Sequence, residues 1–188
     1  GYFQLENEYR PGLGELIQKL RKTHELHLLT GDNDAEKINL VRFFGTEKNI
    51  HFNQTPTDKL NYIRNLQKRG KKVLMIGDGL NDAGALNESN VGIVVADNVF
   101  NFSPACDAIL QSDKFANLDK YMRFTHRSIK IVYAGFLISF LYNLVGLSFA
   151  VQGTLTPIVA AILMPISSVS VVVFASFSVS LSAKVLKM

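Results

Sequence analysis

Two carboxylates beside the end of an apolar segment are the residues in this sequence best suited to chemistry. Asp78 directly follows the apolar segment 73–77, and Asp82 lies four residues further on. If a helix begins near Asn81, Asp82 lies about one helical turn beyond Asp78. Carboxylates placed in this way suit Mg²⁺, which takes a few protein oxygens and keeps waters and phosphate oxygens as its other ligands. We therefore predict a magnesium site at Asp78, with Asp82 as a second, weaker candidate ligand.

A phosphate group could bind beside the same metal ion. Gly77 and Gly79 have no side chain, so they let a phosphate approach the backbone. A second polar segment, Thr30-Gly31-Asp32, offers a hydroxyl and nearby backbone N–H groups to an anion. Lys59, in the first turn of a predicted helix, could direct its ammonium group at the same anion.

Ordinary turns and other nucleotide sites are the alternatives for these segments. Asp-Gly and Asn-Asp pairs are common in turns. The pattern Gly77-x-Gly79-x-x-Asp82 lacks the third glycine of the dinucleotide fingerprint. The sequence contains no GxxxxGK[ST] motif, so a P-loop is not supported. TGD, a lysine after Thr-Pro and GDGxND occur together and in this order, which favours a phosphate site over isolated turns.

Alternating helix and strand patterns predict the scaffold that positions these segments. Apolar spacing and end signals predict helices over three ranges: Gly14–Lys22, Asp34–Phe44 and Thr55–Gly70. Short apolar runs predict strands over three further ranges: His24–Asp32, Lys71–Asp78 and Val91–Ala96. This alternation predicts an α/β fold with a partial Rossmann-like parallel sheet and flanking helices. Ligands of such sheets bind beyond the carboxyl ends of the strands, where both polar segments lie.

The C-terminal third of the sequence has a different composition. Residues 131–183 contain no Asp, Glu, Lys, Arg or His. They divide at Val151–Pro157 into two apolar stretches, 131–150 and 158–183, each long enough to span a bilayer as a helix. We expect Pro165 to break the backbone hydrogen-bond ladder of the second stretch. A buried helical hairpin in a soluble protein is the alternative, but it would need a much larger protein around it.

Charge is concentrated outside the apolar stretches. All 16 acidic residues, and all basic residues except Lys184 and Lys187, lie before Ile131. That part is near neutral, so nucleic-acid binding is not indicated. The basic run Lys114–Lys130 suits a connector that faces lipid headgroups. Basic residues before the first span and after the second predict that both ends of the hairpin are cytoplasmic.

Three motifs resemble the phosphorylation domain of P-type ATPases, which belongs to the haloacid-dehalogenase-like superfamily. They are TGDN at 30–33, TPTDK at 55–59 and MIGDGLNDAGAL at 75–86. Gly84 stands where many relatives have a proline. The resemblance covers residue 13 to about residue 110, and the two hydrophobic segments that follow are similar to the last membrane helix pair of the heavy-metal class.

The resemblance implies roles in phosphoryl transfer for the two polar segments. It implies that Thr30, Gly31 and Asp32 form the phosphate and hinge region, and that Lys59 stabilises charge on the transferring phosphoryl group. It also implies that Asp78 holds Mg²⁺ and that Asn81 and Asp82 complete its surroundings. The family's nucleophilic aspartate, in a DKTG element, is not in this sequence, and ATP would be bound mainly by parts outside the chain.

The membrane stretches contain candidate ligands for a transported metal. Tyr142 and Asn143 lie mid-span in the first, while Met164 and Ser168 are four residues apart on one face of the second. A thioether suits Cu⁺, although methionine also fills gaps in packing, and serine and asparagine also join membrane helices. Tyr-Asn followed by Met-x-x-Ser-Ser is similar to the copper-transporting class, which favours Cu⁺ over zinc, cadmium or another heavy metal.

We therefore expect the C-terminal fragment of an ATP-driven heavy-metal pump, with Cu⁺ export favoured. The expected divisions are residues 1–115 as part of the phosphorylation domain, 116–130 as a basic amphipathic connector and 131–188 as a transmembrane helix pair. The expected location is the plasma or inner membrane, with lipid and the remaining pump domains as partners. The fragment alone should neither hydrolyse ATP nor transport. A membrane-tethered haloacid-dehalogenase-like phosphatase and a non-catalytic interaction fragment are the alternatives.

Overall fold

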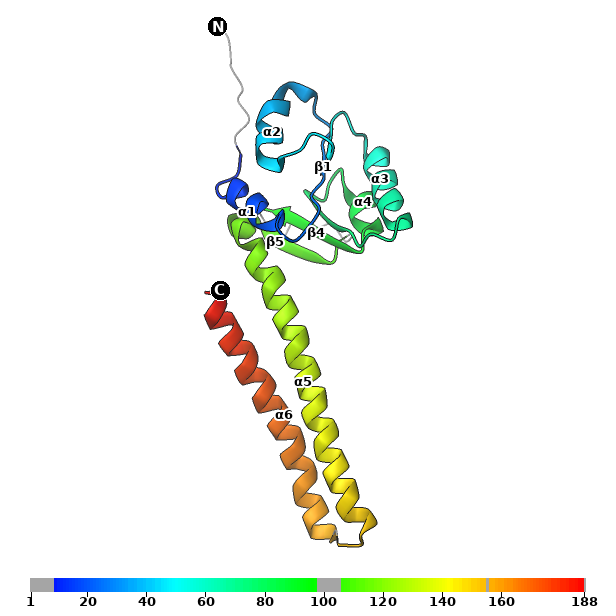
Figure 1. The fold of residues 1–188 in the computed structure, drawn as a ribbon, viewed down its shortest axis with the longest axis vertical. Coiled ribbons are helices and arrows are strands. Elements are labelled where there is room, and N and C mark those ends of the chain that lie inside the picture. Colours follow the sequence, from blue (N-terminus) through cyan, green and yellow to red (C-terminus); the bar gives the residue numbers. More distant parts are fainter. Residues whose placement is uncertain (1–8, 98–105, 155, 188) are drawn as a thin grey trace. The chain divides into compact units, whose positions relative to one another are not determined.

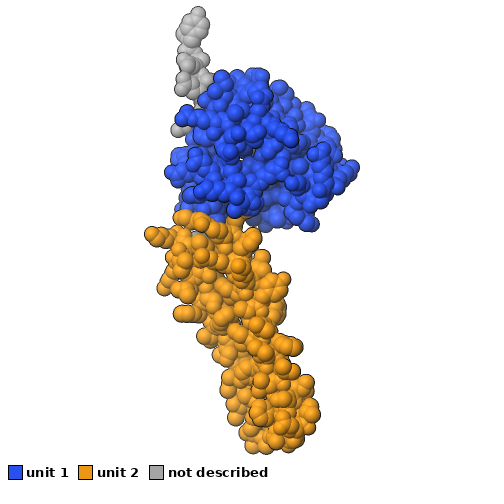
Figure 2. Space-filling model, in the orientation of Figure 1, with its two compact units in different colours: residues 1–119 blue, residues 120–188 orange. Residues whose placement is uncertain are grey.

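The chain forms two compact units in a computed structural model, which describes residues 9–97, 106–154 and 156–187 (Figure 1). Unit 1 comprises residues 1–119, and unit 2 comprises residues 120–188 (Figure 2). The residues expected to form the basic connector, 116–130, lie at the end of unit 1 and in the first turns of the helix that continues into unit 2.

The described helices of unit 1 lie between its strands along the chain. They are α1 (Leu13–Leu20), the 3₁₀ turn η1 (Asp34–Glu36), α2 (Lys37–Phe44), α3 (Pro56–Lys68), α4 (Ala83–Glu88) and the 3₁₀ turn η2 (Ser112–Asn117). The three helices predicted over 14–22, 34–44 and 55–70 are confirmed as α1, α2 and α3. The helix expected from Asp34 begins as a 3₁₀ turn. Gly45 ends α2 with φ 73°, a conformation that glycine adopts at little cost.

All strands in the described residues run parallel, as expected, but they form two sheets rather than one. One sheet pairs β1 (Leu28–Leu29) with β2 (Ile50–His51). The other has the order β3 (Leu74–Gly77), β4 (Val91–Ala96) and β5 (Ala108–Gln111). The strand expected over His24–Asp32 is only two residues long, and within the described residues it pairs with β2 alone. The α/β fold is confirmed, with its sheet in two parts.

Helix α3 is anchored at its start and along one face. Thr55 accepts a hydrogen bond from the Asp58 backbone N–H, and the Asp58 side chain accepts one from the Thr55 N–H, which completes a capping box. Ile63 is 3% exposed and belongs to a core with Met75 of β3, Leu86 of α4 and two further residues, Ala85 and Val94. This packing fixes α3, which carries Lys59 in its first turn, against the second sheet and α4.

Unit 2 is built on two long apolar helices. Helix α5 (Leu118–Val151) begins in unit 1, and α6 (Pro157–Leu186) follows a short turn close to the predicted division. Both helices are long and apolar enough to cross a membrane, and almost none of their side chains is buried within the chain. Thr156 caps α6 by accepting a hydrogen bond from the Val159 N–H. A Cβ added at Gly135 of α5 would lie 3.7 Å from Val171 of α6, so the two helices contact each other there.

Pro165 does not end the second helix. Helix α6 continues through it from Pro157 to Leu186, so the expected break in the ladder does not end the helix. A proline removes a single N–H donor, and hydrogen bonds on both sides hold the remaining helix together.

Candidate functional site

The segment after β3 is a tight turn that leaves Asp78 exposed to solvent. The Asp78 Oδ1 atom accepts a hydrogen bond from the Leu80 N–H at 3.1 Å. Gly79 adopts φ 84°, a left-handed conformation that a side chain would strain. The turn therefore fixes one carboxylate oxygen, while the other has no hydrogen-bond partner among the described residues.

Lys59 and Asp82 form an ion pair at this turn. The Lys59 Nζ atom lies 2.7 Å from Asp82 Oδ1, and the two side chains are 13% and 12% exposed. A Cβ added at Gly77 would lie only 2.7 Å from Asp82 Oδ2, so glycine at this position makes room for the carboxylate. The structure thus brings together three of the predicted site residues: Gly77, Lys59 and Asp82.

Thr30, Gly31 and Asp32 form a second turn, at the carboxyl end of β1. The Thr30 hydroxyl donates to Asp32 Oδ2 and accepts from the Asp32 N–H, both at 3.1 Å. The Gln54 N–H donates to the Thr30 carbonyl at 2.8 Å, and the Asn53 N–H donates to the Asp32 carbonyl at 2.9 Å. These bonds hold the turn beside the residues that lead into α3.

The Thr30 turn and the turn after β3 are connected through the start of α3. The Thr30 turn contacts Gln54, the next residue caps α3, and Lys59 in the first helical turn reaches Asp82. No hydrogen bond or ion pair among the described residues joins the Thr30 turn directly to Lys59 or Asp78. Asn81 is exposed beside Asp82.

The donors at the β3 turn fit Mg²⁺ but not a fully protein-ligated ion. No group of three or more His, Cys, Asp or Glu side chains that could hold a metal occurs in the part of the chain that the structure describes. Mg²⁺ needs only one or two carboxylates when phosphate and water supply its other ligands. Asp78 meets this requirement because its carboxylate is exposed, whereas Asp82 already pairs with Lys59.

The predicted transported-metal residues lie on the two helices of unit 2. Met164 is 76% exposed on α6, and the Ser168 hydroxyl donates to the Met164 carbonyl at 3.4 Å. On α5, Tyr142 is partly buried and Asn143 is exposed. No hydrogen bond between these two pairs of residues is present in the described part of the chain.

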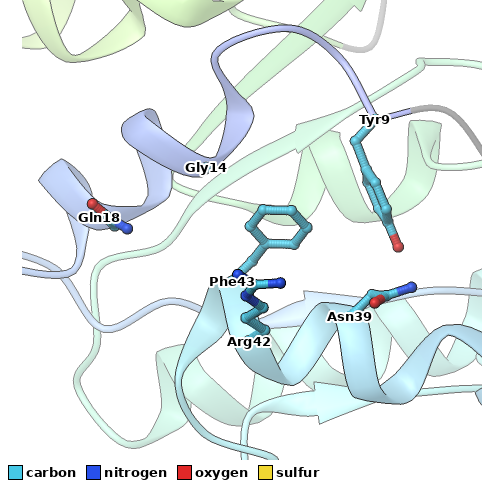
Figure 3. Close-up of a pocket in the computed structure, with 6 residues that line it drawn as sticks. All are labelled: Tyr9, Gly14, Gln18, Asn39, Arg42 and Phe43. Carbon is cyan, nitrogen blue, oxygen red and sulfur yellow. The ribbon is translucent and has the colours of Figure 1, made fainter.

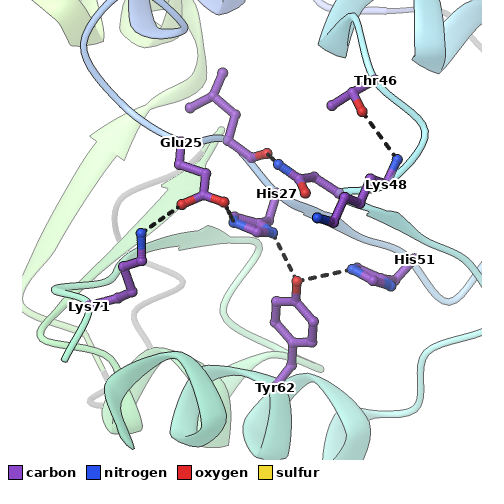
Figure 4. Close-up of polar contacts among 9 residues, drawn as sticks. Glu25, His27, Thr46, Lys48, His51, Tyr62 and Lys71 are labelled. Carbon is purple, nitrogen blue, oxygen red and sulfur yellow. Dashed lines mark hydrogen bonds and ion pairs between the residues drawn. The ribbon is translucent and has the colours of Figure 1, made fainter. Parts of the chain in front are cut away.

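Sequence reasoning missed a polar cluster that joins α3 to the first sheet (Figure 4). The Tyr62 hydroxyl lies 2.8 Å from His27 Nδ1 and 3.0 Å from His51 Nε2. Glu25 Oε1 lies 3.5 Å from His27 Nε2, and its other oxygen accepts from Lys71 at 3.0 Å. The alternation of apolar residues around His51 was too short to predict a strand, so its position beside His27 could not be foreseen.

The cluster changes the ionisation of two of its members. Burial lowers the pKa of His27, which favours the neutral imidazole. The hydrogen bond from Lys71 lowers the pKa of Glu25, which favours its carboxylate. At neutral pH the cluster therefore combines a neutral His27 with an ion pair at its edge.

A cavity of about 540 Å³ lies between α1 and α2, away from these residues (Figure 3). Figure 3 shows Phe43 and Arg42 of α2 facing Gly14 and Gln18 of α1, with Tyr9 and Asn39 at one side. None of the predicted phosphate-site or metal-site residues lines this cavity.

Comparison with known proteins finds similar sequences that extend over both units. The family model for haloacid dehalogenase-like hydrolases matches residues 1–90. The probable copper-importing P-type ATPase A of Enterococcus hirae is 30% identical over 100% of this chain and 26% of its own length. The probable copper-exporting P-type ATPase V of Mycobacterium tuberculosis is 32% identical over 79% of this chain and 19% of its own length. The chain thus spans about a quarter or less of the length of these relatives.

The fold also matches a solved structure. A zinc-transporting PIB-type ATPase in its E2.Pi state superposes with a TM-score of 0.78 and 19% sequence identity. The match covers 93% of this chain and 28% of that chain, so it includes helices of both units. At this identity the match shows that the fold is shared.

Proposed function

The chain resembles the haloacid dehalogenase-like phosphorylation domain and last membrane helix pair of heavy-metal P-type ATPases, and from this premise we propose that it is the C-terminal part of such a pump. The complete pump would couple formation and hydrolysis of an aspartyl phosphate to movement of its membrane helices. Cu⁺ is the favoured cargo and export the favoured direction. The mostly buried Lys59–Asp82 pair beside the exposed Asp78 carboxylate is the observation that carries this proposal.

In this pump Lys59 binds the transferring phosphoryl group. Its ammonium lies at the carboxyl end of β3, where parallel α/β sheets bind ligands. The Asp82 carboxylate holds Lys59 in one position, so little reorganisation is needed when a phosphate arrives. Asn81 is exposed beside this pair, so its side chain is accessible to a phosphate oxygen.

The nucleophilic aspartate comes from outside this chain. Within the described residues β1 pairs only with β2, and β3 has β4 as its one neighbour, so each has an unpaired edge. An unpaired edge is a template for another strand. A parallel strand supplied by the rest of the pump could pair there and end beside the Thr30 and Asp78 turns. Thr30, Gly31 and Asp32 would then contact the phosphoryl group and follow the movement of the domain.

Asp78 is the residue that would hold Mg²⁺. When bound, the ion would neutralise charge on the phosphoryl group. The hydrogen bond from the Leu80 N–H fixes the carboxylate, and its free oxygen faces solvent. We assign Asp82 mainly to orienting Lys59, with any contact to the ion made from the second oxygen of its carboxylate. ATP would be bound mainly by domains outside this chain.

Labelling with radioactive ATP tests the proposed function directly. The full-length protein that contains this chain should acquire an acid-stable, hydroxylamine-sensitive phosphoryl label that requires Mg²⁺. Cu⁺ should stimulate its turnover. The 188-residue chain alone should acquire no label and hydrolyse no ATP. Hydrolysis of a phosphate monoester by the chain alone would favour the phosphatase alternative, and co-purification with a separate intact pump would favour the interaction fragment.

Met164 provides a test of the transported metal. We expect Met164→Ala to raise the Cu⁺ concentration for half-maximal ATPase stimulation about tenfold, which corresponds to a loss of ~1.4 kcal/mol. The physical reason is the loss of a soft thioether ligand. Leu163→Ala removes similar apolar bulk from the adjacent position and should leave the Cu⁺ response unchanged. Equal responses of the two variants would argue against a ligand role for Met164.

Labelling of single cysteines tests the orientation of the hairpin. Gln152 is exposed in the turn between α5 and α6, and we propose that this turn faces outward because basic residues flank the other ends of the helices. In a Cys106→Ala background, Gln152→Cys should react with a membrane-impermeant maleimide on intact cells. The native Cys106 in unit 1 should react only after lysis. The reverse pattern would place unit 1 outside the cell.

A further inference from the structure

Helix α3 contacts both sheets of unit 1, each through a different face. Ile63 packs into the core beside β3, β4 and α4. The neighbouring residue, Tyr62, extends its hydroxyl to His51 in β2 and to His27 just before β1 (Figure 4). A single phenol oxygen therefore joins the helix to β2 and to the residue that precedes β1.

The same helix and sheet carry the two parts of the proposed phosphate site. Lys59 lies three residues before Tyr62, so both side chains project from nearby positions on the surface of α3. The His51 carbonyl accepts a hydrogen bond from the Thr30 N–H at 3.0 Å, so β2 directly supports the Thr30 turn. The contact of Tyr62 with His51 thus lies between the element that carries Lys59 and the element that carries Thr30.

We propose that Tyr62 is a positioning residue: through His27 and His51 it sets the separation between Lys59 and the Thr30 turn, and it releases them when both imidazoles are protonated. This proposal rests on the roles assigned above to Lys59 and Thr30. The protonation of the cluster, by contrast, depends only on Tyr62, the two histidines and the charges around them.

The protonation step follows from the number of hydrogens in the cluster. A phenol has one hydrogen, so Tyr62 donates to one imidazole and accepts from the other. One added proton can be accommodated, because the ring that already donates to Tyr62 takes it on its other nitrogen and both hydrogen bonds keep their direction. With two added protons both ring nitrogens donate, the phenol hydrogen has no acceptor between them, and two positive rings face each other.

The charged groups around the cluster set the pH at which it opens. Glu25 faces His27 and favours its protonated form, whereas the paired Lys71 and the neighbouring His51 oppose it. The charge of Lys48 contributes to lowering the pKa of Glu25. The charge of Arg69, at the end of α3, opposes the rise in the pKa of Tyr62 that burial causes. Burial dominates and lowers the pKa of His27. A lowered histidine pKa contributes stability that is complete above the ordinary value of about 6.5 and is lost as pH falls through the folded value.

Kinetics of the full-length pump test the positioning role. Tyr62→Phe removes only the hydroxyl, and we expect it to slow phosphoenzyme formation at neutral pH by roughly tenfold or more, since small misplacements of catalytic groups carry large costs. The KM for ATP should stay unchanged. The wild-type rate should fall steeply below about pH 6.5, and the slower variant should lack this fall.

Tyr9→Phe is the matched control for this experiment. The Tyr9 hydroxyl donates to Glu36 at 2.9 Å, so the variant also loses one tyrosine hydrogen bond, but away from α3. It should keep the wild-type rate and pH profile. A Tyr62→Phe pump that matches Tyr9→Phe in rate and pH profile would overturn the proposal. If Lys59→Met also labelled at the wild-type rate, the proposed function itself would fail.

NMR titration of the histidine rings gives a readout that does not depend on activity. In the 188-residue chain, the His27 ring should titrate below the ordinary histidine value of about 6.5, because it is buried within the cluster. Tyr62→Phe should change this titration, because the ring loses its hydrogen-bond partner, and His27→Gln assigns the signal. A His27 ring that titrates at the ordinary value in the wild-type chain would overturn the proposal even if the phenylalanine variant failed to fold.

Discussion

Replacing Lys59 with methionine is expected to slow phosphoenzyme formation from ATP in the full-length pump by about a thousandfold, the upper range for loss of one charge-stabilising donor. The Lys59 ammonium is mostly buried and is held 2.7 Å from Asp82 Oδ1, so its charge is poorly screened by water. Methionine retains most of the length of the side chain and removes the charge. The measurement is the initial rate of acid-stable labelling with radioactive ATP.

Controls for this variant must separate lost charge from lost stability. Lys59→Met leaves the Asp82 carboxylate mostly buried without its cation, which destabilises the fold. The double variant Lys59→Met/Asp82→Asn removes that uncompensated charge and should be folded but still slow. Lys68→Met removes an exposed lysine from the last turn of the same helix and should label at the wild-type rate. A folded double variant that labels at the wild-type rate would show that Lys59 does not act on the phosphoryl group.

Local sequence signals were sufficient for the elements that carry their own start and stop. Helix α3 was predicted within two residues at each end, because Thr55 caps it and Gly70 follows it. Strand β4 has the predicted bounds. The strands β2 and β5 were missed because each lies in an apolar run of no more than three residues, whereas β3 follows from four consecutive apolar residues. Strands in such weak patterns are specified by their partners in the sheet.

The candidate site was only partly predictable for the same reason. The order of motifs placed Asp78 after β3 and Lys59 in the first turn of α3, and both positions hold in the structure. The direct pairing of Lys59 with Asp82 depends on how α3 packs against α4, which no local pattern specifies. The bridge from Tyr62 to His27 and His51 depends on β2, so it could not be predicted once that strand was missed.

Asp78→Asn is expected to abolish Mg²⁺-dependent phosphoenzyme formation, a loss of about a thousandfold or more, because phosphoryl transfer relies on the metal to neutralise charge. The substitution is well matched to the structure. An asparagine carbonyl oxygen can still accept the hydrogen bond that Asp78 Oδ1 receives from the Leu80 N–H, so the turn should persist. What is lost is the negative charge on the oxygen that faces solvent. The measurement is labelling with radioactive ATP across a range of Mg²⁺ concentrations.

The Mg²⁺ dependence separates a ligand from a residue that merely shapes the turn. If Asp78 binds the ion, excess Mg²⁺ should restore part of the label in Asp78→Asn, because a weakened site fills at higher concentration. Asp34→Asn removes an exposed carboxylate from the first turn of η1 and should keep the wild-type Mg²⁺ response. Unchanged labelling of Asp78→Asn at low Mg²⁺ would exclude Asp78 as a ligand, and the metal would then have to be held by Asp82 and groups outside this chain.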